Sequence, residues 1–322
     1  MKTKISLQDI YRARKAIAPW VTRTPVVRSE SLSSLSKASV YLKLETVHEV
    51  GAFKIRGATN RILSLTKQQK SKGVVTASTG NHGRSVVSIA SKLGIRATVC
   101  MSKLVPSNKV EAIKRMGGEV CIVGESQDDA EKHALALVAE HGFTYVPPFD
   151  DKHVIAGQGT IGLELLEDLG QVDAALIGLS GGGLMSGIAL ALKTANPAVR
   201  IIAVSMERGA AMFESVRQGK PVEVKEEPTL ADSLGGGIGL NNAYTFDMVK
   251  DLVDEYILLS EEQIAAGMRH LYEQEKMVVE GAAAVGVAAI LEGLAGELSG
   301  NVACVISGNN VDMTTFNRVV HG

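Results

Sequence analysis

Short apolar segments rich in β-branched residues alternate with segments of helical length along most of this 322-residue chain. Such alternation is typical of α/β proteins, whose parallel sheets carry helices on both faces. The strands that we predict span residues 40–44, 74–77, 97–101, 120–123, 174–179, 201–206, 256–259 and 302–306. The helices that we predict between them span residues 83–93, 108–116, 128–141 and 184–195.

Local signals also mark a first helix and a crossing point. Ser6 and Asp9 form a helix start signal, which predicts a helix that runs to about Ala18, before Pro19. The segment 143–150 resembles a linker and predicts a crossing between two domains. The length of the chain allows two domains or one large α/β domain.

The composition excludes several classes of partner. The formal net charge is −1 and no basic block occurs, so we expect neither nucleic acid nor an anionic membrane as a partner. Residues 1–20 contain no apolar segment typical of a signal peptide, so we expect none, and the longest apolar stretch, around residues 281–291, is too short to span a bilayer. The three cysteines, Cys100, Cys121 and Cys304, lack CxxC spacing. We therefore expect buried, reduced thiols in a cytoplasmic protein.

The motif GAFKIRG at residues 51–57 sets one lysine, Lys54, between Phe53 and Ile55. A lysine forms an imine with an aldehyde only as the free amine, so it needs burial or nearby positive charge to lower its pKa. The apolar neighbours predict such burial, and Arg56 is a candidate source of positive charge. The alternative is that Lys54 is a surface lysine at a helix start.

A glycine-rich turn at residues 180–184 follows the predicted strand 174–179 and precedes a helical segment. Glycines there expose successive backbone N–H groups at a helix N-terminus, where a phosphate can bind. One alternative is a tight turn without a ligand. Another is a dinucleotide site, because the spacing from Gly181 to Ser186 nearly matches that fingerprint and Glu207 ends the next predicted strand.

Two further polar segments follow predicted strands. The motif STGNHG at residues 78–83 supplies hydroxyls, the Asn81 amide and backbone N–H groups, which suit a carboxylate and a phenolic oxygen. His82 alone is more typical of a structural hydrogen-bonding residue. Ser307 follows the strand 302–306, at the sheet edge where ligands of open α/β sheets bind. The histidines show no grouping typical of a metal site, and we expect no metal.

Taken together, these motifs resemble those of fold type II pyridoxal phosphate (PLP) enzymes of the threonine/serine dehydratase and serine racemase family. The resemblance extends from about Leu7 to Val320. It implies a tryptophan synthase beta-like fold with two open, twisted parallel-sheet domains and helices on both faces. It also implies a homodimer, with a large PLP-binding domain of residues 1–72 and 147–322 and an inserted small domain of residues 73–146.

The resemblance assigns the cofactor-binding residues. By this resemblance Lys54 carries PLP as an imine and later moves a proton, Phe53 packs near the pyridine ring, and Asn81 binds its phenolic oxygen. Ser307 faces the pyridine nitrogen, and Glu280 lies near that end of the ring. The residues implied to hold the phosphate are Ser180, Gly181, Gly182, Gly183 and Leu184.

The resemblance also assigns the substrate-binding loop and the reaction. The residues implied to bind the substrate carboxylate are Ser78, Thr79, Gly80, Asn81 and His82. A neutral Ser307 makes PLP a milder electron sink, which favours loss of water from a hydroxy amino acid to give a 2-oxo acid and ammonia. Thr79 stands where racemases place a catalytic serine, so efficient racemisation is not expected although its hydroxyl is a candidate acid. Phe213 replaces an acidic metal ligand of some members.

Within this family the chain is most similar to hydroxyectoine utilisation dehydratases, through residues 46–50, 232–239 and 279–281. That similarity implies a cyclic amidine acid, or its ring-opened hydroxy amino acid, with His48 and Glu49 as added polar contacts. The alternative is that both residues belong to a surface loop.

Other functions stay open at this stage. The chain could be an L-threonine/L-serine dehydratase or a serine racemase-type enzyme. A more distant alternative is an NAD(P)-dependent oxidoreductase, whose nucleotide binding would survive Lys54→Ala. A PLP-holding regulatory protein would lack turnover.

Overall fold

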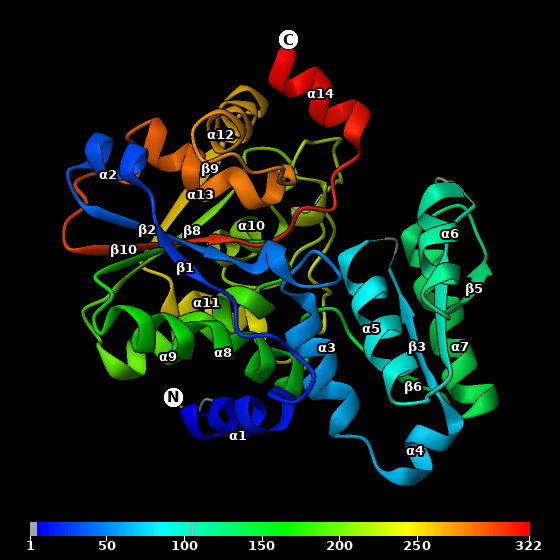
Figure 1. The fold of residues 1–322 in the computed structure, drawn as a ribbon. Helices are drawn as coiled ribbons and strands as arrows, with labels where there is room; N and C mark the ends of the chain where they lie inside the picture. Colours follow the sequence, from blue (N-terminus) through cyan, green and yellow to red (C-terminus); the bar gives the residue numbers. More distant parts are fainter. Residues whose placement is uncertain (1–4, 79, 104, 106) are drawn as a thin grey trace.

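Two sheets organise the chain, which a computed structural model describes at residues 5–78, 80–103, 105 and 107–322. The larger sheet consists, in spatial order, of β1 (Val26–Arg28), β2 (Ser39–Leu44), β10 (Asn301–Ile306), β7 (Ala174–Gly178), β8 (Arg200–Met206) and β9 (Glu255–Leu259). The smaller sheet consists of β5 (Glu119–Ile122), β4 (Ala97–Met101), β3 (Val74–Ala77) and β6 (Thr144–Tyr145) (Figure 1). Among the described strands every pair is parallel except β1 with β2.

The predicted strands are all confirmed, with ends that differ by at most one residue. Two short strands, β1 and β6, were not predicted because neither has enough apolar residues to show a periodic pattern. The prediction that residues 143–150 form a linker is partly wrong, because Thr144 and Tyr145 form a strand that pairs with β3. The crossing between the sheets therefore begins after Tyr145.

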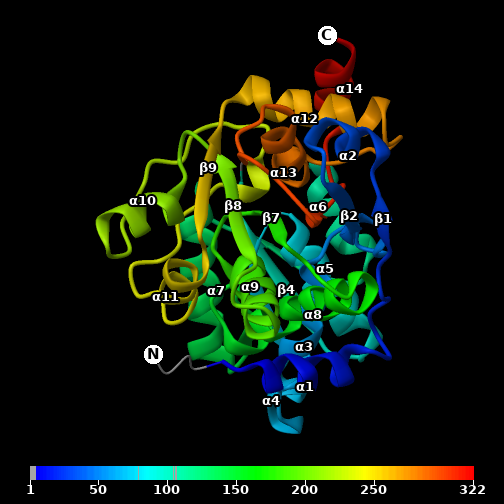
Figure 2. The ribbon, with the colours of Figure 1, turned by 90° about the vertical axis from the view of Figure 1, so that its left-hand side faces the viewer.

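Helices cover both faces of the larger sheet (Figure 2). One face carries α2 (Glu30–Ser36), α12 (Glu261–Glu273), α13 (Gly281–Leu291) and α14 (Met313–His321). The other carries α8 (Lys152–Leu169), α9 (Gly183–Ala195), α10 (Ala211–Gln218) and α11 (Thr245–Leu252). Successive side chains of a strand point to opposite faces, so Leu176 enters the first core and Ile177 enters the second. Burial on both faces explains why these strands are apolar throughout.

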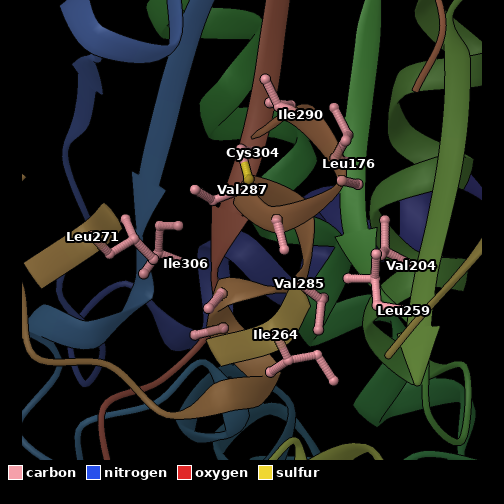
Figure 3. Close-up of a cluster of buried hydrophobic side chains, with 14 of the residues drawn as sticks. Leu176, Val204, Leu259, Ile264, Leu271, Val285, Val287, Ile290, Cys304 and Ile306 are labelled. Atoms are coloured by element: carbon pink, nitrogen blue, oxygen red, sulfur yellow. The ribbon is translucent and has the colours of Figure 1, made fainter. Parts of the chain in front are cut away.

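Figure 3 shows the first of these cores, in which Cys304 lies beside Leu176 and residues of α13. Cys100 and Cys304 are buried, and burial raises the pKa of each thiol to about 12. The expectation of buried cysteines is wrong for Cys121, which is partly exposed on the edge strand β5. None of the described helices is long and apolar enough to cross a membrane.

The smaller sheet is also covered on both faces. One face packs against α5 (Asn81–Lys92) and α6 (Ser107–Arg115), and the other packs against α7 (Gln127–His141). Helix α3 (Lys54–Leu63) contributes Ile55 and Ile62 to the core shared with α5, and α4 (Lys67–Lys72) leads into β3. The division into domains at residues 73 and 146 stays a prediction, and this packing of α3 shows how closely residues before 73 contact the smaller sheet.

The first helix is formed as predicted. Helix α1 (Leu7–Ile17) begins after Ser6, whose backbone N and Oγ lie 2.9 and 2.7 Å from Asp9 Oδ2. These hydrogen bonds satisfy donors at the helix start. Its apolar face, including Ile10 and Ala13, packs against Ile155 of α8. Two short 3₁₀ helices complete the fold, η1 (Glu45–Val47) and η2 (Asp232–Leu234).

Candidate active site

The segment before Lys54 is bound to the segment that follows β10. The Phe53 backbone N donates to the Ser307 carbonyl oxygen at 3.0 Å, and the Asn309 N donates to the Gly51 carbonyl oxygen at 2.9 Å. These bonds place Lys54, the first residue of α3, at the carboxyl end of a central strand of the larger sheet. Ligands of open α/β sheets bind at this edge.

Lys54 carries an amine that is poised near neutral pH. Its Nζ donates to the Pro148 carbonyl oxygen at 2.7 Å and lies 5.3 Å from the centre of the Phe53 ring. Burial lowers the pKa of Lys54 to about 8, although the Glu280 carboxylate opposes that shift. The alternative of an ordinary surface lysine is therefore wrong.

Arg56 does not supply the positive charge that we expected beside Lys54. Its guanidinium forms short ion pairs with Glu45 at 2.7 Å and with Glu164 at 2.6 Å. Both acids neutralise its charge, so burial is what favours the neutral amine of Lys54. Lys54 and Arg56, two positions apart, can thus face different surroundings, because a helix turns about 100° per residue and their side chains point about 200° apart.

Asn81 and Glu280 meet from opposite sides of the site. The Asn81 Nδ2 lies 2.9 and 3.0 Å from the two carboxylate oxygens of Glu280, and Asn81 Oδ1 accepts from Asn310 Nδ2 at 2.6 Å. Burial raises the pKa of Glu280 to about 7, and the charge of Asp232 adds to that rise. The predicted bond from Asn81 to a phenolic oxygen therefore requires Asn81 to share or release its contact with Glu280.

The glycine turn is held against the chain crossing by close contact. A Cβ added to Gly181 would lie 2.3 Å from Phe149 Cδ1, and one added to Gly183 would lie 3.0 Å from Phe149 Cα. Gly182 is the N-cap of α9 and has a φ of 85°, a left-handed conformation that favours glycine. The turn thus opens α9, whose first backbone N–H groups have no acceptor within the helix. Ser186 Oγ, one turn further, is buried and has no hydrogen-bond partner among the described residues.

Ser78 follows β3 at its carboxyl end, and Gly80 is the N-cap residue of α5, which begins with Asn81 and His82. No atom lies within 4 Å of a Cβ added to Gly80, so the backbone there is open to a ligand. His82 is buried, and its Nε2 lies 2.9 Å from the Val146 carbonyl oxygen, as suits a structural hydrogen-bonding residue. Burial, together with the charge of Lys54, lowers the pKa of His82 to about 3, so its ring is neutral. Thr79 lies outside the described residues.

Four of the predicted site segments therefore converge, and the structure adds residues that sequence reasoning missed. Pro148 and Phe149, in the crossing between the sheets, contact Lys54 and the glycine turn. Asn310 joins the two sides of the site, since its Nδ2 also donates to the Val50 carbonyl oxygen at 2.7 Å. Neither Pro148, Phe149 nor Asn310 belongs to a motif from which this role could have been predicted.

His48 and Glu49 each form hydrogen bonds with other side chains of the protein. His48 is buried and its Nε2 lies 2.9 Å from Glu45 Oε2, so it is not a surface residue and it faces Glu45. Glu49 accepts hydrogen bonds from Ser88 Oγ and Lys92 Nζ, both at 2.6 Å. Both side chains were predicted to contact a substrate. Because each is already bonded to other residues of the protein, the structure does not support those contacts.

Phe213 is the residue that the resemblance aligns with an acidic metal ligand of some family members. Its ring packs against Tyr256, with the ring centres 5.9 Å apart. A phenyl ring carries no oxygen, nitrogen or sulfur atom that could bind a metal ion. The absence of a metal from the protein stays a prediction.

These features define a class of protein: an α/β protein with a partly buried lysine, a glycine turn at a helix N-terminus and a serine after a central strand, all near the carboxyl ends of parallel strands. The chain belongs to the pyridoxal-phosphate dependent enzyme family, whose model matches residues 17–308. It has the fold type II architecture, and its cofactor is PLP. The dinucleotide alternative for residues 180–187 is thereby disfavoured.

Several known proteins are similar to the chain over nearly its full length. A Sinorhizobium fredii protein, provisionally named a threonine dehydratase, is 51% identical over 99% of this chain and 96% of its own length. The L-threonine ammonia-lyase of Thermotoga maritima is 41% identical, over 98% of this chain and 78% of its own. The structure of maize serine racemase matches with a TM-score of 0.90 and 35% identity, over 98% of this chain and 97% of that one.

The residues present fit PLP. The partly buried amine of Lys54 suits the aldehyde, and the glycine turn before α9 suits the phosphate, with the unpartnered Ser186 hydroxyl one turn along the helix. When bound, PLP supplies an electron sink for charge that develops at the substrate Cα. The chain itself contributes Lys54, which can accept or release a proton at Nζ near pH 8, and Ser307, which offers a neutral hydroxyl.

Proposed function

We propose that this protein removes water from a β-hydroxy amino acid and yields a 2-oxo acid and ammonia. The observation that carries the proposal is Lys54, whose pKa of about 8 lets its amine exchange a proton near neutral pH. In the proposed reaction the substrate loses the proton from Cα and the hydroxide from Cβ. The resulting enamine rearranges to an imine, which water hydrolyses to the 2-oxo acid and ammonia.

In this proposal separate segments of the chain bind the substrate carboxylate, the cofactor phosphate and the cofactor ring. The backbone at Ser78, Gly80 and His82 binds the substrate carboxylate, and residues 180–184 hold the phosphate. Phe53 packs beside the ring, and Ser307 hydrogen-bonds to the pyridine nitrogen as a neutral group. Because a hydroxyl keeps that nitrogen largely unprotonated, charge at Cα is short-lived and elimination is favoured over transamination.

The substrate is the finer part of the proposal. One candidate is a hydroxy amino acid derived from hydroxyectoine, supported by the resemblance at residues 232–239 and 279–281. The engagement of His48 with Glu45, and of Glu49 with Lys92, removes the side-chain contacts first suggested for it. The second candidate is L-threonine or L-serine, which the names of the relatives favour.

We also propose a homodimeric, cytoplasmic enzyme with a small domain of residues 73–146 inserted into the large one. The separation of the two sheets supports the division of the chain. Sedimentation of the purified protein tests the dimer, and limited proteolysis near residues 73 and 146 tests the domain boundaries.

The deciding experiment combines cofactor mapping with a substrate screen. The visible absorption of the purified protein is recorded, the sample is reduced with borohydride, and peptides are mapped for an adduct on Lys54. Release of 2-oxo acid and ammonia is then measured with L-threonine, L-serine and the hydroxyectoine-derived compound. We expect the adduct on Lys54 and elimination from at least one of these compounds.

The other outcomes separate the alternatives. An adduct on Lys54 without turnover of any amino acid would indicate a PLP-holding regulatory protein. Formation of D-serine from L-serine as the main product would indicate a racemase. Absence of any cofactor band after addition of PLP, with nucleotide binding that survives Lys54→Ala, would indicate an oxidoreductase.

A further inference from the structure

A cluster of buried charged side chains lies beside the first turn of the Lys54 helix. Its ionisable and hydroxyl members come from four separate parts of the chain, and each is at most 6% exposed. They are Thr24, Lys43, Glu45, His48, Arg56, Thr160 and Glu164. The cofactor chemistry described above uses none of them.

Arg56 is the centre of this cluster. Its Nε and Nη2 donate to the two carboxylate oxygens of Glu45, at 2.7 and 2.9 Å. Its Nη1 and Nη2 donate to the two oxygens of Glu164, at 2.6 and 2.8 Å. Thr160 Oγ1 and Thr24 Oγ1, each at 3.1 Å, complete its contacts. The guanidinium is thus bound in two forks, which fix both its position and its plane.

Two more residues complete the charge balance and the hydrogen bonds. Lys43 Nζ donates to Glu164 Oε2 at 2.6 Å and to the Thr24 carbonyl oxygen at 2.7 Å. His48 Nε2 lies 2.9 Å from Glu45 Oε2. Burial alone would raise the pKa of Glu45, but the Arg56 guanidinium and His48 hold it below its usual range. Two cations therefore face two ionised carboxylates.

Stability alone is a weak reason for such a cluster. Ions removed from water lose their hydration, and apolar residues of similar volume are often as stabilising as a buried ion pair. The cluster does have a geometric effect, because it ties α3 to η1 through Glu45 and to α8 through Glu164. Directional forks restrain orientation in a way that apolar contacts do not.

The start of α3 depends on such restraints. Phe53 is its N-cap residue and makes no side-chain capping bond. Lys54 and Arg56 are the first and third residues of the helix, so they share its first turn. Any rotation or shift of that turn moves Nζ of Lys54 away from the Pro148 carbonyl oxygen, 2.7 Å distant.

We propose that Arg56, held by Glu45 and Glu164, is a positioning residue that sets the location of the Lys54 amine for the cofactor. The cluster then serves cofactor binding and catalysis more than it serves the stability of the fold. This inference rests on PLP binding at Lys54, and it does not depend on which amino acid is the substrate.

The first test is Arg56→Lys in the holoenzyme, which keeps the charge but removes both forks. We expect the protein to stay folded, with a dissociation constant for PLP about tenfold higher, which corresponds to about 1.4 kcal/mol. We expect kcat to fall by up to about a hundredfold with little change in KM, as for a misplacement of about 1 Å. The measurements are absorbance titration with PLP, steady-state kinetics and the thermal unfolding midpoint. Arg61→Lys, on the same helix and ion-paired at 3.1 Å with Asp151, is the matched control.

A second variant distinguishes an effect on the position of Lys54 from an effect on the stability of the fold. Replacement of all four charges with apolar residues, K43M/E45L/R56M/E164L, is expected to keep or raise the unfolding midpoint while PLP affinity still falls. If the fourfold variant does not fold, His48→Leu provides the milder perturbation, and His48→Gln should restore the loss because an amide can also donate to Glu45.

Each outcome bears on the proposal. Unchanged PLP affinity and kcat in Arg56→Lys would overturn it, as would losses in PLP affinity that merely parallel a lower unfolding midpoint across all variants. Failure of the wild-type enzyme to dehydrate any amino acid would refute only the proposed function, since PLP affinity still measures the position of Lys54.

Discussion

The pH at which Lys54 becomes a free amine can be measured directly. Its pKa of about 8, against an ordinary value of 10.5, corresponds to about 3 kcal/mol against the protonated form. At pH 7.5 about one quarter of the molecules then carry the free amine, whereas an ordinary lysine would supply about 0.1%. Because only the free amine attacks the aldehyde, the rate of covalent PLP capture should rise with pH and reach half its plateau near pH 8.

The charge of Glu280 provides a second perturbation with a definite sign. Its carboxylate raises the pKa of Lys54, and above pH 7 most of this acid is ionised, since its own pKa is about 7. Glu280→Gln removes the charge and keeps a group of similar shape. The midpoint of PLP capture should therefore move below pH 8, and Glu140→Gln, on the exposed side of α7, should leave it unchanged.

The assay mixes cofactor-free protein with PLP at a series of pH values and follows the visible absorbance in a stopped-flow instrument. Borohydride trapping confirms that the product is bound to Lys54. A midpoint near 10.5 would refute the conclusion that burial activates this amine. A midpoint that moves upward in Glu280→Gln would refute the assigned sign of its influence.

Lys54→Ala should abolish turnover and leave the thermal unfolding midpoint nearly unchanged, because it removes an amine and no core volume; normal turnover would refute the mechanism. Ser307→Ala should weaken catalysis by about 0.5–1.5 kcal/mol, the contribution of one neutral hydrogen bond, as judged from kcat/KM; complete loss of PLP would instead indicate a larger structural role. Gly181→Ala should weaken PLP binding by about tenfold, or about 1.4 kcal/mol, since its Cβ would meet Phe149 at 2.3 Å. Gly237→Ala is the control, with no atom within 4 Å of its Cβ, and equal PLP affinity in both variants would contradict the assignment of the turn.

The regular elements could be predicted where local pattern alone determines them. Strands β3 and β4 coincide with the predicted segments, because short β-branched segments between turn residues have few other ways to bury their side chains. The short strands β1 and β6 could not be predicted in this way. They are strands because of what they pair with, and β6 gains its hydrogen bonds from β3, which lies about 70 residues earlier in the sequence.

In the candidate site too, some residues could be predicted from local sequence and others depend on the tertiary structure. Residue type and position beside predicted strands were enough to select Lys54, the glycine turn and Ser307, because each needs only a local motif at a sheet edge. The carbonyl of Pro148 and the side chain of Phe149 have no such motif, and their contacts with the site arise from the path of the chain between the two sheets.

The sequence by itself determined which groups are available: an amine, a glycine turn and a hydroxyl near the ends of parallel strands. The tertiary structure alone decided how those groups are charged and oriented. The charge of Arg56 was expected to lower the pKa of Lys54, two residues away. Arg56 instead forms ion pairs with Glu45 and Glu164, and His48 belongs to the same cluster. Electrostatic interaction depends on distance and burial in space, and more than 100 residues of sequence separate Arg56 from Glu164.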